Sequence, residues 1–158
     1  MKYAEREKLY LPIVASEFAK AGLPPHLGAA IARQESAFDP NAAVLTGGDG
    51  ARGGAFGLCQ MTLKTALSLD KGATSGRLLD ARYNAELAAK LCLENWKRFQ
   101  GRIEDVISAY NSGKPFFRAP ESTKLLYVPS VQKYMKQYEV TCAPYVASTL
   151  SQADGSAE

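Results

Sequence analysis

The side chain in this sequence with the best prospects for chemistry is the carboxyl group of Glu35. It lies in residues 31–42 (IARQESAFDPNA), at the end of an apolar stretch with helical periodicity. A carboxylate in the last turn of a helix lies at the negative end of the helix dipole, and partial burial also disfavours its charge. Both effects raise a carboxyl pKa toward neutrality, as a general acid requires. A glutamate late in a helix is more often a surface residue, so the prediction depends on its neighbours.

Other common catalytic chemistries lack the residues that they need. The sequence holds one histidine and three cysteines, namely His26, Cys59, Cys92 and Cys142. This count argues against a Ser-His-Asp hydrolase, a zinc enzyme and a disulfide scaffold, so we interpret the cysteines as buried free thiols and His26 as an incidental or capping residue. Residues 48–53 match a dinucleotide fingerprint as a string, but they follow a helix instead of a strand. We therefore expect neither a metal nor an organic cofactor.

Two further segments support the prediction that Glu35 is a catalytic residue. Residues 56–60 read FGLCQ and residues 109–113 read AYNSG; alone, they suit a turn into a helix and a helix C-cap. Together with QES at 34–36, in this order, they closely resemble the soluble lytic transglycosylase and goose-type lysozyme family (lysozyme-like superfamily, SLT domain). The family signature reads Glu-Ser, Gly-Leu-Met-Gln followed by Thr-Ala, Ala-Tyr-Asn-x-Gly, and Tyr-Val before a terminal helix. The matching residues here are Glu35-Ser36, Gly57–Gln60 with Thr65-Ala66, Ala109–Gly113 and Tyr127-Val128, within a resemblance that covers about residues 11–138.

The resemblance implies a peptidoglycan lytic transglycosylase with Glu35 as its sole acid and base. In that family the glutamic acid protonates the oxygen of the β-1,4 bond between N-acetylmuramic acid and N-acetylglucosamine. It then accepts the proton of the muramic C6 hydroxyl, which attacks C1 of its own sugar and closes a 1,6-anhydro ring without water. The substrate-binding residues that the resemblance implies are Ser36, Gln60, Tyr110, Asn111 and Tyr127.

The same resemblance also allows a second hypothesis for the reaction, namely hydrolysis of the glycosidic bond. The Gly-Asp-Gly at 48–50 resembles a goose-type lysozyme loop in which an aspartate helps to position water. If Asp49 faces the cleft as a second carboxylate, inverting hydrolysis becomes the alternative reaction. That mechanism needs the carboxyl groups of Glu35 and Asp49 to lie ~6.5–9.5 Å apart. A second lysozyme aspartate, two residues after the glutamine, is replaced by Thr62, which favours the transglycosylase. Asp49 could equally serve only to order a glycine turn.

Helical periodicity and its breakers indicate the elements that position these residues. We predict helices at 4–21, 26–38, 61–69, 84–99, 103–110 and 128–138, with one or two further turns at 142–150. Asp80 is expected to cap a helix, Gly113 to form a left-handed C-cap and Pro129 to lie in a first turn. Alternating strand patterns are absent. The sequence thus predicts a mainly α, lysozyme-like single domain with a catalytic cleft over residues 1–150, and a flexible tail at 151–158.

Composition and charge limit the classes of partner that the protein can be expected to bind. The 158 residues suffice for one domain, and the net charge of +3 is too small for a typical nucleic-acid binder. Residues 97–136 hold eight basic and three acidic side chains, either as a solvated face or as a weakly basic wall toward an anionic polymer. No run approaches the ~18 apolar residues of a membrane span. We expect peptidoglycan glycan strands as the partner, no nucleic acid, no stable membrane insertion and a monomer.

The expected place of action is the bacterial cell wall, in the periplasm or exterior. We recognise no signal-peptide pattern, which leaves three origins open: a phage virion protein or endolysin, a domain cut from a larger exported protein, or a secretion-system accessory muramidase. A third hypothesis for function is a non-catalytic wall-binding or virion structural module that kept the fold. The joint presence of Glu35, Gln60, Tyr110 and Asn111 argues against it.

Overall fold

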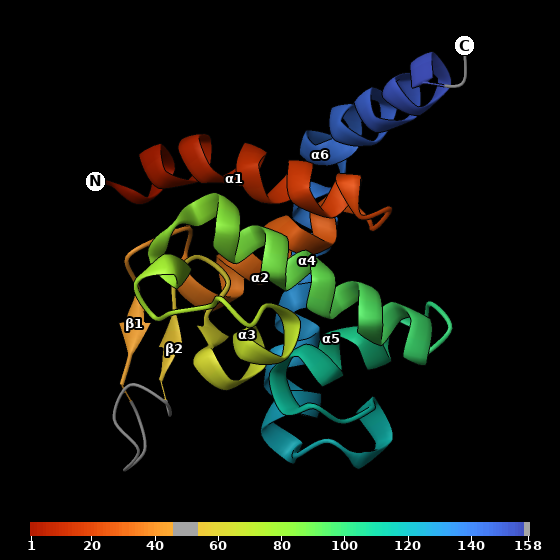
Figure 1. Ribbon diagram of the computed structural model, residues 1–158. Helices are drawn as coiled ribbons and strands as arrows, with labels where there is room; N and C mark the ends of the chain where they lie inside the picture. The colour runs from red at the N-terminus through yellow and green to blue at the C-terminus, as the bar shows by residue number, and fades with distance from the viewer. Residues whose placement is uncertain (46–53, 157–158) are drawn as a thin grey trace.

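The chain folds into helices arranged around one central helix, with a small sheet at one side (Figure 1). A computed structural model describes residues 1–45 and 54–156, and the side chains up to residue 146. The α-helices among these residues are α1 (Tyr3–Lys20), α2 (Pro25–Ser36), α3 (Leu63–Leu69), α4 (Ala81–Arg98), α5 (Ile103–Ser112) and α6 (Val128–Ser156). The mainly α fold class is therefore confirmed.

Helix α2 forms the centre of the core and packs against both α1 and α6. Its residues from Leu27 to Ala32 are fully or almost fully buried, and most of them are small. Small side chains allow neighbouring helices to approach closely: a Cβ atom on Gly28 would lie 2.5 Å from the ring of Phe18 on α1. The end of α2, where Glu35 lies, is thus fixed from both sides.

Three residues predicted to begin or end helices do so, while some helix bounds differ by two or three residues: α2 ends at Ser36 instead of Phe38, and α4 begins at Ala81 instead of Asn84. The Asp80 side chain accepts a hydrogen bond from the backbone of Tyr83 at 2.8 Å and begins α4. Gly113 ends α5 with a left-handed φ of 73°, and Pro129 lies in the first turn of α6. The three cysteines are free and buried, as predicted.

Two larger differences from the prediction concern a small sheet and the length of the last helix. A three-stranded antiparallel sheet pairs β1 (Ala43–Val44) with β2 (Ala55–Phe56), and β2 with β3 (Met61–Thr62). Strands of two residues are too short to show an alternating pattern, so periodicity does not predict them. Helix α6 continues through Pro144 to Ser156 and projects from the body (Figure 1), so it is one continuous helix where the sequence predicted 128–138 and one or two further turns at 142–150.

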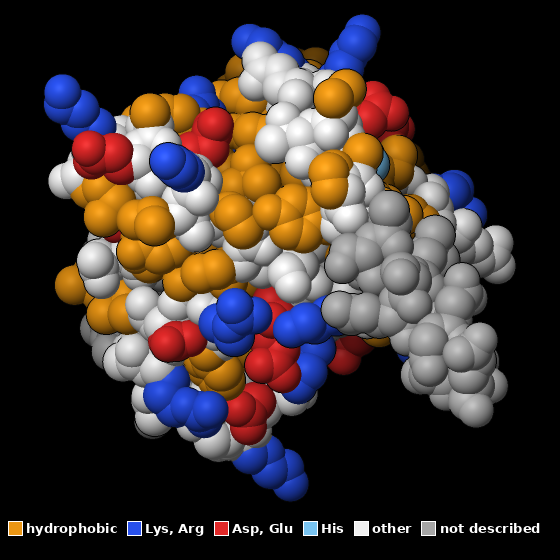
Figure 2. Space-filling view, turned by 90° about the horizontal axis from the view of Figure 1, so that it is seen from above, with side chains coloured by type: hydrophobic (Ala, Val, Ile, Leu, Met, Phe, Trp, Pro, Cys, Tyr) orange, Lys and Arg blue, Asp and Glu red, His pale blue; other side chains and the backbone are white. Residues whose placement is uncertain are grey.

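Figure 2 shows the charged side chains on one face of the molecule. On the face seen from the side of α1, basic and acidic groups lie interspersed among hydrophobic ones (Figure 2). The basic residues of 97–136 lie on α4, on α6 and in the segments on either side of α5, and Arg102 pairs with Asp105 at 2.9 Å. The positive charge of this stretch is therefore distributed over several elements.

Candidate active site

Glu35 lies in the last turn of α2, after a series of buried residues. The helix ends because Ala37 and Phe38 adopt left-handed backbone angles, with φ of 51° and 60°, and the Phe38 side chain is completely buried. Burial raises the pKa of the Glu35 carboxyl from 4.5 to about 7, and a hydrogen bond from Tyr127 opposes this increase. Near neutral pH the carboxyl group can therefore both give and take a proton.

Tyr127 holds the Glu35 carboxyl in place from the other side of the site. It is the last residue of η4 (Thr123–Tyr127), a π-helical turn that leads into α6; such turns are frequent at functional sites. The Tyr127 hydroxyl donates to Oε1 of Glu35 at 2.6 Å. Burial and the neighbouring Glu35 raise the pKa of Tyr127 well above 10.0, so the phenol remains protonated and keeps donating.

The loop at 57–60 is tied to both helices that carry predicted site residues. The Ser36 hydroxyl donates to the carbonyl of Leu58 at 2.6 Å. The Tyr110 hydroxyl, from α5, donates to the carbonyl of Cys59, also at 2.6 Å. Two successive carbonyls therefore join this loop to the end of α2 and to α5. Within the described structure, Ser36 and Tyr110 use their hydroxyl protons on the backbone of this loop.

Gln60 closes the same loop. Its backbone is left-handed, with φ of 51°. The side-chain nitrogen donates to the carbonyls of Ala42 at 3.1 Å and Gly57 at 2.9 Å. The amide nitrogen thus stabilises the link between β1 and the loop, and within the described residues the amide oxygen accepts no hydrogen bond.

Asn84 is a residue of this site that the sequence analysis did not single out. It is fully buried on α4, accepts from the backbone N–H of Cys59 at 2.8 Å, and donates to the carbonyls of Phe56 and Leu78 at 2.8 and 2.9 Å. A Cβ atom on Gly57, whose φ is 80°, would lie 2.1 Å from the Leu78 carbonyl oxygen. A polar residue in the buried stripe of a helix is the sequence signal that points to such a role.

A hollow opens between Gln34, the residue before Glu35, and Tyr127, the hydrogen-bond partner of Glu35. Its volume is about 530 Å³, and it is lined by Gln34, Asn111, Ser122, Leu126, Tyr127 and Ser130. Asn111 is exposed at the end of α5, and its amide oxygen accepts from the Thr123 hydroxyl at 2.7 Å. The structure thus brings Asn111 and Tyr127 to one cavity, and Glu35 is joined to this cavity through its hydrogen bond from Tyr127.

The two positions that bear on the hydrolytic alternative lie elsewhere. Asp49 lies outside the described residues, and Thr62 serves as the N-cap of α3.

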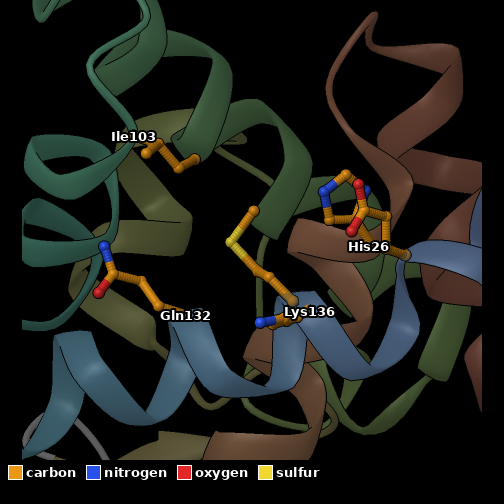
Figure 3. A pocket seen from close by; sticks show the side chains of 6 residues that line it. His26, Ile103, Gln132 and Lys136 are labelled. Atoms are coloured by element: carbon orange, nitrogen blue, oxygen red, sulfur yellow. The ribbon is translucent and has the colours of Figure 1, made fainter.

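The single histidine lies in a different hollow. His26, Ile103, Gln132 and Lys136 surround a space of about 280 Å³ between α2, α5 and α6 (Figure 3). Burial lowers the pKa of His26, and the charge of Glu139 opposes this decrease. Among the described residues, no three His, Cys, Asp or Glu side chains are grouped so that they could hold a metal ion.

Comparison with known proteins agrees with this geometry. A family model described as "Transglycosylase SLT domain" matches residues 13–124, well over half of the chain. The chain belongs to this family. The match contains Glu35, the 57–60 loop and Asn111, and it ends shortly before Tyr127. No curated protein and no solved structure matches the chain.

Family membership supports action of the lytic transglycosylase type on peptidoglycan. The substrate class is therefore peptidoglycan, and the place of action is the bacterial cell wall, in the periplasm or exterior. None of the helices in the described part of the chain combines the length and the apolar character needed to cross a membrane.

Proposed function

We propose that this SLT domain cleaves the β-1,4 bond between N-acetylmuramic acid and N-acetylglucosamine without water, with Glu35 as the sole acid and base. The observation that carries the proposal is the environment of Glu35: a largely buried carboxyl group with a pKa of about 7 that receives a hydrogen bond from Tyr127. No carboxylate among the described residues contributes to this pKa shift. One proton-transfer group suffices when acid and base act in sequence on the same face of the sugar.

The reaction then balances without a second reactant. Protonated Glu35 donates to the glycosidic oxygen while the bond from C1 to that oxygen breaks, and N-acetylglucosamine leaves with a free 4-hydroxyl. The Glu35 carboxylate then accepts the proton of the muramic C6 hydroxyl, whose oxygen bonds to C1. The products carry a 1,6-anhydromuramic end, and Glu35 is again protonated. The substrate's own acetamido group shields the charge at C1 in the meantime.

The other residues of the site have supporting roles in this proposal. Tyr127 orients Glu35 and stabilises its carboxylate in the second half of the reaction. Asn111 and the free oxygen of Gln60 bind the carbohydrate. Ser36 and Tyr110 act as positioning residues, since their hydroxyl groups hold the 57–60 loop.

The first test is the variant Glu35→Gln, which removes the exchangeable proton and keeps the shape of the side chain. We expect clearance of purified cell walls to fall by at least about a hundredfold, because general acid catalysis contributes at least that much. The matched control is Glu94→Gln, an exposed carboxyl on α4, which should clear walls at the wild-type rate.

Clearance, wall binding and the type of product end, measured on the same purified cell walls, distinguish the three candidate functions. Full clearance by Glu35→Gln would refute the proposed chemistry. Wall binding by the wild type with no product from any glycan would instead point to a structural module. Cleavage that is lost on Asp49→Asn and gives reducing ends would support hydrolysis.

A further inference from the structure

Two amide side chains in the hollow that Tyr127 lines have their oxygen atoms occupied by the protein. Gln34 Oε1 accepts from the hydroxyl of Ser130 on α6. Asn111 Oδ1 accepts from the hydroxyl of Thr123 in η4 at 2.7 Å. Within the described structure, neither amide nitrogen donates to a protein group. Both amides therefore offer their NH₂ groups to whatever fills the hollow.

The hydroxyl of Thr123 determines the orientation of the Asn111 amide. The Thr123 residue is 1% exposed, so its hydroxyl has almost no access to water, and Asn111 is its hydrogen-bond partner. An unpaired buried hydroxyl is costly. The burial of Thr123 thus keeps the Asn111 oxygen turned inward and the nitrogen available.

The remaining lining indicates the chemistry of the ligand. The hollow has no Lys, Arg, Asp or Glu among its lining residues in the described part of the chain, and Leu126 presents an apolar side chain that is 70% exposed. Neutral NH₂ donors beside an apolar side chain suit a neutral group that has a carbonyl oxygen next to a methyl. An acetamido group has this combination, and both sugars of peptidoglycan carry one.

We propose that this hollow is an acetamido subsite, in which Gln34 and Asn111 donate to the acetamido carbonyl, Leu126 contacts its methyl, and Thr123 and Ser130 are positioning residues. The proposal rests on the proposed function, since it takes N-acetylated glycan as the substrate. It adds a specificity: strands without acetyl groups bind weakly, independently of whether they can be cleaved.

Binding to the Glu35→Gln variant tests the subsite without cleavage. The probes are the tetrasaccharides of N-acetylglucosamine, of glucosamine and of glucose; the last lacks the acetamido group and is uncharged. We expect the acetylated probe to bind at least about tenfold more tightly than both others. Equal affinities for the acetylated and glucose tetramers would overturn the proposal.

Variants at Thr123 test the positioning role. On the same Glu35→Gln background, Thr123→Val should weaken binding of the acetylated probe by about tenfold, leave the glucose probe unchanged, and be rescued by Thr123→Ser. Thr141→Val, at an exposed threonine on α6, is the control. A Thr123→Val variant that weakens both probes equally would assign Thr123 a merely structural role and overturn the proposal. Because cleavage does not enter these measurements, they fail or succeed separately from the wall-clearing test.

Discussion

The acidity of Glu35 results from two opposing influences on a single side chain. Burial raises its pKa to about 7, and the hydrogen bond from Tyr127 lowers it. The balance places the carboxyl group where both halves of the proposed reaction can proceed. Substitutions that remove one influence should therefore shift the pH dependence in a defined direction.

Tyr127→Phe removes the hydrogen bond and leaves burial largely in place. In the wild type we expect kcat/KM to fall as the pH rises through about 7, because the protonated acid starts the reaction. In the variant this decrease should occur at a higher pH, since the carboxylate has lost a stabilising donor. A pH profile of wall cleavage measures the shift, with Tyr10→Phe as a control. A profile that stays in place or moves to lower pH would show that the bond from Tyr127 does not set the acidity.

The raised pKa also predicts a cost in stability. The folded state binds the Glu35 proton up to about pH 7, whereas a free carboxyl loses it near 4.5. The stability associated with this proton is therefore present below pH 4.5 and lost as the pH rises to about 7, by on the order of 3 kcal/mol. Glu35→Gln should consequently have a higher Tm than the wild type at pH 8 and a similar one at pH 4. An equal difference at both pH values would contradict the assigned burial effect.

At the scale of elements, the 57–60 loop depends on contacts from three helices. Ser36 on α2, Asn84 on α4 and Tyr110 on α5 all bond to its backbone or to the flanking Phe56. Gly57 gives this loop a left-handed turn in a space where a side chain does not fit. The loop is therefore a rigid part of the site.

Gly57→Ala tests this rigidity. We expect it to lower the free energy of unfolding by more than about 3 kcal/mol, because the new Cβ would meet the Leu78 carbonyl. Gly22→Ala is the matched control: its φ of 78° is similar, and nothing lies within 4 Å of its Cβ. Left-handed strain alone costs roughly 1–2 kcal/mol. Chemical denaturation measures both, and equal losses would show that the loop can move aside.

The features of this structure that could be predicted are those that depend on residues close together in the sequence. Periodicity together with Asp80, Gly113 and Pro129 predicts the helices, and the order of the motifs indicates Glu35 and Tyr127 as site residues. The partners of Asn84 and Thr123 were not predictable, because each bond joins elements whose approach only the fold determines. The sequence predicts a helix at 128–138 and one or two further turns at 142–150, whereas α6 runs through Pro144 without a break. The carbonyl that this proline leaves unpaired belongs to Val140, which is 85% exposed and can bond to water.

At the scale of the whole molecule, the fold serves to bring distant segments to one carboxyl group. Glu35 and Tyr127 are 92 positions apart in the chain and meet because α2 packs against α6. The α5 motif and the 57–60 loop complete the surroundings. The central claim is therefore that one carboxyl group, held in this way, cleaves peptidoglycan without using water.

The most direct test of this claim is mass spectrometry of the fragments released from purified cell walls in water enriched in the heavy oxygen isotope. We predict 1,6-anhydromuramic ends, lighter by one water than hydrolytic ends and free of the heavy isotope. The Glu35→Gln variant should release neither kind of fragment. Reducing muramic ends that carry one heavy oxygen atom would show that water attacks the sugar and would contradict the account.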